Sequence, residues 1–252
     1  MNQIPGEELT SFSSFKVTSA ETDMKARLRP GALVNILIQS AIQSADALGF
    51  GFGGMQQEKL FWVLSRMTIA IERPFNWYET VEVETWPKDV DGLLYLRDFI
   101  IRDSSRHVVA SATSGWLAVN IETKRPCRIE GVDALIFDRL KFKHALESHP
   151  EKLPAIQPLT STDKIITYFD IDLNKHVTAT RYMDWMMDTI PVDYLLTHYP
   201  SGISINYMKE SQLGDTILLQ SEQKSQDLYL FEGINKASGQ SSFRGKVEFQ
   251  KV

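Results

Sequence analysis

A repeated order of segments constrains the fold of this chain more than any other feature. Four segments of the first half alternate apolar and polar residues, or are rich in β-branched and aromatic residues, which is typical of β-strands. They are 62–71, 79–86, 94–102 and 107–121. Four similar segments follow in the same order in the second half, at 203–209, 216–221, 228–236 and 242–250. The order alone indicates either a duplicated unit or two β meanders that are similar by chance.

Local sequence matches favour the duplication. Leu94-Tyr95-Leu96 recurs as Leu228-Tyr229-Leu230, an offset of 134 (228 minus 94). Thr68-Ile69 recurs as Ser204-Ile205, an offset of 136 (204 minus 68), and Glu79-Thr80 recurs as Asp215-Thr216 at the same offset. A near-constant offset over several strands predicts a duplicated unit of about 120–135 residues.

One buried helix is expected ahead of the strands in each half. In the first half it spans about 31–48, and its polar residues step by four, four and three, which places them on one helical stripe. These residues are Asn35, Gln39, Gln43 and Asp46, and Gly49 is placed to end the helix. In the second half a helix is expected over about 178–190, with Pro191 as its stop. Its polar stripe consists of Arg181, Asp184 and Asp188.

A helix wrapped by a curled antiparallel sheet satisfies both patterns, and this is the hot-dog arrangement. We therefore expect an α+β fold, a double hot-dog of two tandem units. The expected boundaries are 1–135 for the N-terminal unit, 136–162 for a crossover linker and 163–252 for the C-terminal unit. A short helix is expected near 133–148, and a strand over 164–169 leads into the second helix.

Composition excludes several classes of protein. The chain has 32 acidic and 27 basic residues, a net charge of −5, which argues against nucleic-acid binding because that needs a large basic face. Cys127 is the only cysteine, so neither an internal disulfide nor a cysteine-rich zinc site is expected. The first residues have no apolar core typical of a secretory signal, and the most apolar stretch, 33–48, is broken by six polar residues. We therefore expect a cytoplasmic protein without a membrane span.

The densest polar cluster runs from Asp170 to Val177, between a predicted strand and the second helix. Backbone N–H groups and the positive end of the helix dipole meet at such a junction, where they can stabilise a developing oxyanion. His176 is a candidate general base or acid, and Asn174 is a candidate to bind a carbonyl or to orient His176. The alternative is that the Asp and Asn residues are turn and cap residues, and that His176 is an ordinary loop histidine.

Glu210 is a second candidate, because it follows the apolar run 203–208 at the carboxyl end of a strand that should lie near the second helix. A carboxylate at this place can orient His176 or activate a water molecule. Taken alone, the position of Glu210 favours a solvated residue at a strand end over a catalytic one.

The string DIDLNKHVTATRYMDW resembles the signature of the acyl-acyl carrier protein thioesterases, which reads D-x-D-x-N-x-H-V-N-N-x-x-Y-x-x-W in the plant plastid enzymes. The matching residues are Asp172, Asn174, His176, Val177, Tyr182 and Trp185. The family's next motif, Arg-Arg-Glu-Cys, has its counterpart in Met208-Lys209-Glu210-Ser211, with Glu210 34 residues after His176 (210 minus 176). The resemblance covers the chain from about residue 8 and agrees with a double hot-dog.

The resemblance implies hydrolysis of the thioester that joins a fatty acyl chain to the phosphopantetheine arm of acyl carrier protein. It places the catalytic residues Asp172, Asn174, His176 and Glu210 in the second half, and it implies no metal and no organic cofactor. The sequence departs from the family at Thr178-Ala179, where the family has Asn-Asn, and at Ser211, where it has cysteine. A cysteine nucleophile is therefore absent, which leaves attack by water as the expected mechanism and Ser211 as a minor alternative nucleophile.

In the expected mechanism His176 and Glu210 activate the water. Asn174 and the backbone N–H groups near Val177 and Thr178 hold the thioester oxygen, and Asp172 orients Asn174 or the loop. The equivalent stretch of the first half, 22–27, has no Asn or His, so this half is expected to shape the acyl pocket without a catalytic role. The candidates for the pocket wall are Val34, Leu37, Ile38, Ile42, Trp62, Met67 and Trp86, and packing in the core is the default alternative for each of them.

Acyl carrier protein is acidic, so a locally basic docking surface is expected. Three groups of residues are candidates: Lys124, Arg125 and Arg128; Arg139, Lys141 and Lys143; and Lys175, Arg181 and Lys209. A thioesterase for coenzyme A esters and a non-catalytic acyl-binding protein remain alternatives. The sequence does not decide acyl length, and it leaves open whether the protein is a monomer or a homodimer.

Overall fold

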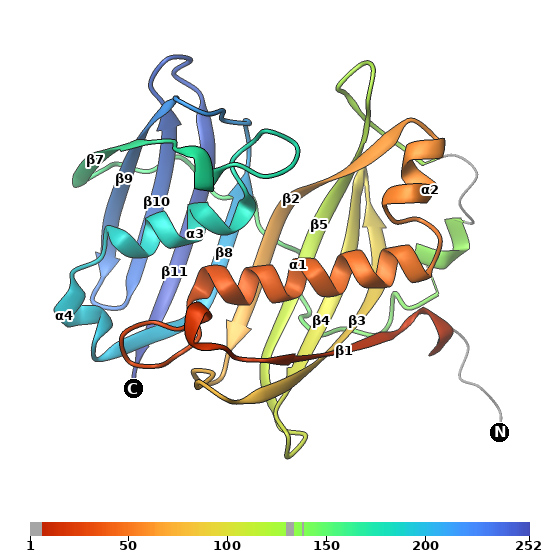
Figure 1. Cartoon of the computed structure of the whole chain (residues 1–252), viewed down its shortest axis with the longest axis horizontal. Coiled ribbons are helices and arrows are strands. Elements are labelled where there is room, and N and C mark those ends of the chain that lie inside the picture. The colour runs from red at the N-terminus through yellow and green to blue at the C-terminus, as the bar shows by residue number, and fades with distance from the viewer. Residues whose placement is uncertain (1–6, 130–133, 138) are drawn as a thin grey trace.

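The computed structural model describes residues 7–129, 134–137 and 139–252, which fold around one antiparallel sheet of eleven strands (Figure 1). The strands of the first half are β1 (Ser11–Lys16), β2 (Leu60–Ile71), β3 (Thr80–Asp91), β4 (Leu94–Arg102), β5 (Val108–Asn120) and the two-residue β6 (Pro126–Cys127). Those of the second half are β7 (Thr160–Ile165), β8 (His198–Tyr207), β9 (Thr216–Ser225), β10 (Leu228–Asn235) and β11 (Ser241–Lys251). All eight strands of the predicted repeat are present, so the predicted α+β double hot-dog is confirmed.

The sheet order shows that the two halves are related by a pseudo-two-fold axis. The strands follow the order β1-β3-β4-β5-β2-β8-β11-β10-β9-β7, so each half reads the same from its edge to the centre. The halves join where β2 pairs with β8, and Thr68 lies opposite Ser204 in this pairing. These are the two residues that the sequence repeat relates at an offset of 136 (204 minus 68), so the axis passes between them.

Two long helices cover one face of this sheet (Figure 1). They are α1 (Pro30–Ala47) and α3 (Ala179–Asp188), and the shorter α2 (Phe52–Gln57) and α4 (Val192–Leu195) follow them. The predicted polar stripe of α1 is exposed, while Leu33, Val34 and Leu37 of the same helix are fully buried against the sheet. A Cβ atom on Gly31 would overlap the Asp184 carboxylate, so glycine at this position allows α1 and α3 to approach closely.

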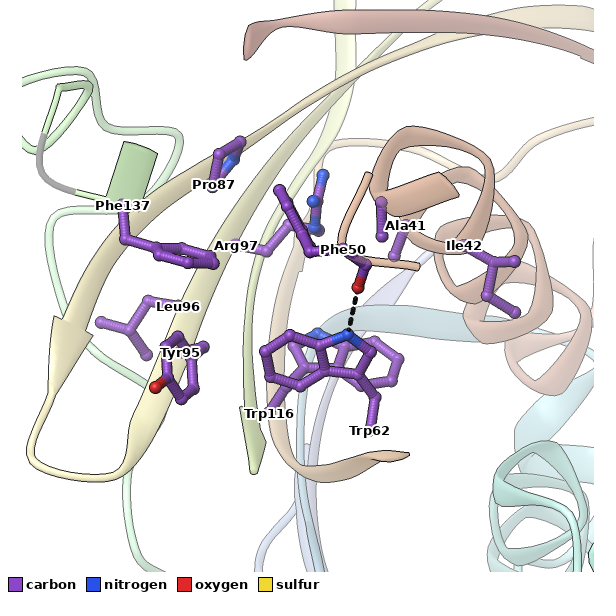
Figure 2. A pocket seen from close by; sticks show the side chains of 11 residues that line it. Ala41, Ile42, Phe50, Trp62, Pro87, Tyr95, Leu96, Arg97, Trp116 and Phe137 are labelled. Atoms are coloured by element: carbon purple, nitrogen blue, oxygen red, sulfur yellow. Dashed lines mark hydrogen bonds between the residues drawn. The ribbon is translucent and has the colours of Figure 1, made fainter. Parts of the chain in front are cut away.

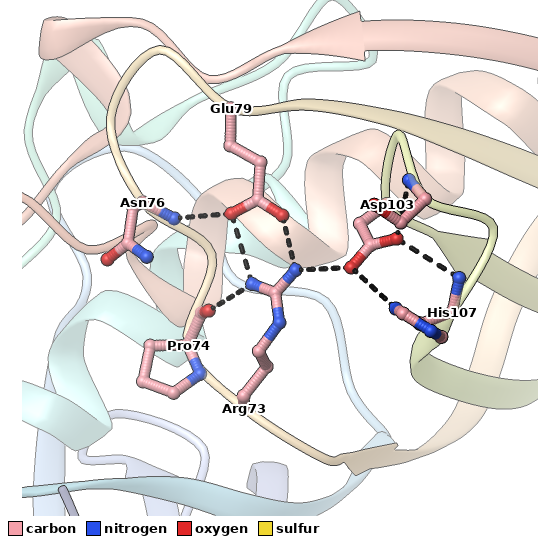
Figure 3. Close-up of polar contacts among 7 residues, drawn as sticks. Arg73, Pro74, Asn76, Glu79, Asp103 and His107 are labelled. Atoms are coloured by element: carbon pink, nitrogen blue, oxygen red, sulfur yellow. Dashed lines mark hydrogen bonds and ion pairs between the residues drawn. The ribbon is translucent and has the colours of Figure 1, made fainter.

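Both repeats use the same turn to enter their second long strand. The Glu79 carboxylate accepts the backbone N–H of Asn76 at 2.9 Å, and the Asp215 carboxylate accepts the N–H of Gln212 at 2.9 Å. In the first half Arg73 extends this turn (Figure 3), because its guanidinium contacts Glu79 at 2.6 Å and Asp103 at 3.0 Å. Arg73 thereby ties the β2–β3 connection to the turn between β4 and β5.

Two predicted elements differ from the structure. Within the expected helix near 133–148, the described residues contain only a 3-10 helix, Ala134–Phe137, followed by turns, and positions 133 and 138 lie outside the described residues. The expected strand over 164–169 is wrong from residue 166 onward, since β7 ends at Ile165 and a 3-10 helix, Tyr168–Asp170, follows. Thr167 caps that short helix through its contact with Asp170, which ends the extended conformation.

No helix in the described part of the chain is long and apolar enough to span a membrane.

Candidate functional site

His176 and Glu210 form the centre of the candidate site. His176 lies in the loop ahead of α3, and Glu210 lies three residues beyond the carboxyl end of β8. The distance between His176 Nε2 and Glu210 Oε2 is 3.1 Å, and both side chains are partly exposed. The structure therefore brings together the two residues that the sequence singled out 34 positions apart (210 minus 176). An imidazole and a carboxylate in hydrogen-bond contact can together accept a proton from a water molecule.

Asp172 shapes the loop that presents His176. Its Oδ1 accepts the backbone N–H of Asn174 at 2.8 Å and that of His176 at 3.3 Å. Its own N–H donates to the His176 carbonyl at 2.8 Å. An Asp side chain that holds N–H groups of the following residues is a common device of tight turns. Asp172 thus acts on the backbone of this loop.

Asn174 differs from the other three predicted residues because its side chain makes no hydrogen bond to the described residues. It is exposed, and its side-chain amide has no hydrogen-bond partner among the described residues. Its side-chain N–H donors are therefore free for a ligand oxygen.

Asp170 is a structural residue of the site to which the sequence analysis assigned no role. Its carboxylate is fully buried, accepts the Thr167 N–H and hydroxyl at 2.8 Å each, and accepts Arg181 Nε at 2.9 Å. Burial by itself raises the pKa of Asp170, but the hydrogen bonds from Thr167 and Arg181 outweigh it and the net pKa is lowered. The Thr-x-x-Asp spacing of a capping box was the sequence signal for this contact.

Two backbone N–H groups that were expected to hold the thioester oxygen are already engaged. The Val177 N–H donates to the Ser211 carbonyl at 3.1 Å, and the Thr178 N–H donates to the Asp170 carbonyl at 3.0 Å. These two groups fasten the loop to its surroundings, so among the N–H groups near Val177 and Thr178 the donors have to be sought further along the chain. The N–H groups of Ala179 and Thr180 at the start of α3 remain as donors, since the first turn of a helix lacks internal acceptors and Thr178 makes no side-chain cap. The next N–H group, that of Arg181, donates to the Thr178 carbonyl at 3.0 Å.

Ser211, at the position of the family cysteine, is buried beneath the loop. Its hydroxyl oxygen lies 2.8 Å from that of Ser242, and its side chain has no exposed surface. This environment is that of a packing residue.

The first half contains a second copy of the His176 loop. Asp23 Oδ1 accepts the N–H groups of Lys25 at 2.8 Å and Arg27 at 3.0 Å, as Asp172 does for Asn174 and His176 at an offset of 149 (172 minus 23). Arg27 stands where the loop of the second half has His176. Its guanidinium is bound by Asp23 at 2.9 Å and by the carbonyls of Leu195 and His198. The predicted equivalence of 22–27 with the His176 loop is confirmed.

An apolar pocket of about 60 Å³ lies between the carboxyl-terminal half of α1 and strands β2, β3, β4 and β5 (Figure 2). Its lining residues are Ala41, Ile42, Ala45, Phe50, Trp62, Pro87, Tyr95, Leu96, Arg97, Trp116 and Phe137. Trp62 donates its indole N–H to the Phe50 carbonyl at 2.8 Å, which fixes one aromatic wall (Figure 2).

Only two of the candidates for the pocket wall, Ile42 and Trp62, line this pocket. Val34, Leu37, Ile38 and Met67 belong instead to the main core between the helices and the sheet. Trp86 packs with Leu9 and Leu140 in a separate cluster. The apolar pattern of α1 could not separate these roles, because core and pocket positions are equally apolar.

Arg97 is the one charged residue among those that line this pocket. It is buried, and its Nη1 donates to Ser44 Oγ at 2.9 Å and to Thr85 Oγ1 at 3.3 Å. No carboxylate among the described residues forms an ion pair with it, and burial lowers its pKa to about 10.

The pocket and the His176–Glu210 pair lie at the same end of the sheet. Arg66 of β2 pairs with Asn206 of β8 in antiparallel register. Trp62 precedes Arg66 by four residues and Glu210 follows Asn206 by four residues, so both lie in the same direction from this pair.

A larger cavity of about 360 Å³ lies beside the Arg27 loop, among residues that include Arg29 and Asp184.

The candidate basic residues differ in whether they already form ion pairs within the chain. Arg139 pairs with Glu8, and Lys143 pairs with Glu84, so these two cations bind within the chain. Arg181 is held by Asp170 and Asp184. Lys175 and Lys209, by contrast, are exposed beside His176 and Glu210 and form no ion pair with the described residues.

Comparison with known proteins agrees with this arrangement. The model of the acyl-ACP thioesterase N-terminal domain matches residues 8–133, and that of the C-terminal domain matches residues 156–251. The chain is 29% identical over 231 residues to the chloroplastic acyl-[acyl-carrier-protein] hydrolase FATB1 of Cuphea viscosissima, covering 86% of this chain and 55% of that protein. It is 27% identical to the chloroplastic oleoyl-acyl carrier protein thioesterase 2 of Arabidopsis thaliana, covering 90% of this chain and 67% of that protein. The chain thus spans little more than half of the first relative and two thirds of the second.

Solved structures show the same fold. An acyl-ACP thioesterase from Bacteroides thetaiotaomicron superposes with a TM-score of 0.89 at 26% identity, covering 98% of this chain and 100% of that one. The 12:0-ACP thioesterase from Umbellularia californica superposes with a TM-score of 0.84 at 21% identity, covering 97% of this chain and 98% of that one. Because the two domain models together match most of its length, this chain belongs to the acyl-ACP thioesterase family.

Proposed function

We propose that this protein hydrolyses the thioester of fatty acyl-acyl carrier protein, releasing a free fatty acid and ending chain elongation. The observation that carries the proposal is the 3.1 Å contact of His176 with Glu210 beside the Asp172 turn. Family membership supports it, since both curated relatives described above are named as hydrolases or thioesterases of acyl carrier protein esters.

In the proposed mechanism a water molecule attacks the carbonyl carbon of the thioester. The His176–Glu210 pair accepts the proton of the water as the new C–O bond forms. The C–S bond of the tetrahedral intermediate then breaks, and the proton passes to the departing sulfur, so the products are a fatty acid and the free thiol of the phosphopantetheine arm. Transfer of protons by positioned side chains typically contributes about 10²–10⁴-fold in rate.

The developing negative charge on the thioester oxygen needs hydrogen-bond donors. The free side-chain amide of Asn174 and the N–H groups at the start of α3 supply them in this proposal, and the positive end of the helix dipole adds to the effect. Asp172 is a positioning residue, because it holds the loop that carries both Asn174 and His176.

We propose a division of labour between the units. The C-terminal unit, 163–252, holds the catalytic residues, and the crossover, 136–162, connects it to the N-terminal unit, 1–135. The N-terminal unit supplies the acyl pocket, since the apolar pocket at Trp62 lies at the same end of the sheet as Glu210. It lacks a catalytic set, because Arg27 replaces His176 and is bound by Asp23.

Release of free thiol from acyl carrier protein esters of several chain lengths tests the proposal. We expect turnover by the wild-type protein and a loss of about 10²–10⁴-fold in kcat for His176→Ala. Faster turnover of matched coenzyme A esters than of carrier protein esters would identify an acyl-CoA thioesterase. Binding of acyl chains without release of thiol would show a non-catalytic acyl-binding protein.

A further inference from the structure

Three large apolar side chains are exposed on the loop that carries His176. The exposed fraction is 77% for Tyr168, 85% for Phe169 and 86% for Leu173. The rings of Tyr168 and Phe169 meet edge to face with centroids 5.3 Å apart, so they form one contiguous surface. Single exposed apolar residues are ordinary, but a contiguous group of them is typical of an interaction surface.

The second copy of the loop shows that the fold does not require these aromatic residues. At the offset of 149 that relates Asp172 to Asp23, Tyr168 and Phe169 correspond to Ser19 and Ala20. The capping box is the same in both copies, with Thr167 and Asp170 in one and Thr18 and Glu21 in the other. One backbone geometry therefore forms with small residues in the first half and with two exposed rings in the second, where the candidate catalytic pair lies.

Positive charge is placed differently in the two loops, since the exposed Lys25 of the first half corresponds to Asn174, and Lys175 has no basic counterpart. Lys175 adopts a left-handed backbone with a φ of 66°, and its counterpart Ala26 has a φ of 59°. Lys175 and Lys209 are exposed without an ion-pair partner among the described residues, while the nearby carboxylates are engaged. Glu210 contacts His176, and Asp172 accepts backbone N–H groups. Two exposed lysines without an ion pair among the described residues thus lie next to His176 and Glu210 in the chain, and Lys175 is on the same loop as the apolar residues.

We propose that Tyr168, Phe169 and Leu173, with Lys175 and Lys209 at their rim, form the docking surface for the acidic carrier protein that delivers the thioester. This inference rests on the proposed function and names the surface through which its substrate binds. Aromatic anchors within a charged rim are typical of protein interfaces, and a basic rim complements an acidic partner. A second copy of this chain fits less well, because a symmetric contact would place these lysines against each other.

The test transplants the first-half residues into the second loop. Tyr168→Ser with Phe169→Ala reproduces Ser19-Ala20, which this loop geometry already accommodates. We expect kcat/KM for acyl-carrier-protein to fall by about 10–100-fold, mainly through KM. We expect kcat/KM for the N-acetylcysteamine thioester of the same acyl group to stay within about twofold, because that substrate has no protein to dock. The matched control is Met24→Ala, which removes the 77%-exposed counterpart of Leu173. This variant should leave kcat/KM unchanged for both thioesters.

The lysines are tested through salt dependence. Lys175→Asn removes the charge and introduces a residue that tolerates the left-handed conformation. Combined with Lys209→Gln, it should make the turnover of the carrier-protein substrate less sensitive to rising salt. A salt dependence equal to that of the wild type would overturn the role of the rim.

Binding of the carrier protein without an acyl group, measured by calorimetry, separates failure of docking from failure of the proposed function. Weaker binding by the Tyr168→Ser, Phe169→Ala variant supports the docking surface even if the wild type hydrolyses neither substrate. Absence of binding by the wild type, unchanged binding by the variant, or an equal loss on both thioesters overturns it. A wild-type dimer that this variant converts to a monomer would assign the surface to self-association and would also overturn the proposal.

Discussion

Thr68 and Ser204 lie opposite each other where the two halves of the sheet join, and their Oγ atoms are 3.3 Å apart. The sequence repeat makes these residues equivalent, so the pseudo-two-fold axis of the molecule passes between them. The two halves therefore share one sheet and one core, in which Leu37 of α1 and Met186 of α3 belong to the same buried cluster. Neither half has a complete core by itself.

The shared sheet predicts that the second half is not a stable monomer when expressed alone. A fragment of residues 151–252 exposes the edge of β8 and the buried face of α3, and unpaired edges of this kind associate with other strands. We expect the fragment to form dimers or larger aggregates, measured by light scattering after gel filtration. A folded monomer with a cooperative thermal transition would contradict this expectation.

The contact between His176 and Glu210 predicts that the two residues act as a unit. We expect His176→Ala and Glu210→Gln each to lower kcat by about 10²–10⁴-fold, because each removes one part of a shared proton acceptor. The double variant should be scarcely slower than the worse single variant, since residues that act together are not additive. Steady-state rates on one acyl-carrier-protein substrate measure this, and additive losses would show that the residues act independently.

Ser211→Ala is the control for this experiment. The Ser211 hydroxyl is buried against Ser242, so its removal should leave most of the turnover intact. A trapped ester between the acyl group and Ser211 would show covalent catalysis in place of attack by water.

Asp170 predicts how the loop responds to acid. Its folded-state pKa is lowered, so the folded protein binds fewer protons at this group than the unfolded chain does at low pH. Its contribution to the free energy of unfolding is therefore complete above about pH 4, the ordinary range of Asp, and is lost as the pH falls through the lower folded value. Denaturant unfolding between about pH 2 and pH 7 should show a smaller pH dependence for Asp170→Asn.

The same variant should also be less stable at neutral pH. It replaces one buried acceptor of Thr167 and Arg181, so we expect a loss of about 1–3 kcal/mol. Unchanged stability at pH 7 would show that the capping contact is not needed to hold the loop.

Because pocket residues and core residues of α1 are distinct, a pocket variant should alter acyl chain-length preference and a core variant should alter stability. Ala45→Leu adds volume to the pocket wall and should shift turnover toward shorter acyl chains, measured as relative kcat/KM across a series of chain lengths. Leu37→Ala removes a core residue that does not line this pocket, so it should cost about 2–5 kcal/mol of stability and leave the preference unchanged. An unchanged preference in Ala45→Leu would exclude this pocket as the acyl site.

Much of the fold could be predicted from local sequence patterns. The strands of the repeat and the exposed stripe of α1 were readable because their periodicity is set by the backbone geometry of strands and helices. The approach of His176 and Glu210 was expected because one lies at a helix start and the other at the end of a strand beside that helix. The crossover was poorly predicted, because charged and apolar residues alternate there without forming a regular helix, and Lys143 instead pairs with Glu84.

The sequence by itself determined the duplication, the two buried helices and the residue set around His176, since each depends on the order and spacing of side chains. Only the tertiary structure decided which apolar residues line the pocket and which fill the core, as Ile42 and Leu37 on one helix show. It also decided that the Val177 and Thr178 N–H groups are engaged and that Tyr168 and Phe169 remain exposed. These properties depend on what lies opposite each group in space, and the partners come from distant parts of the chain.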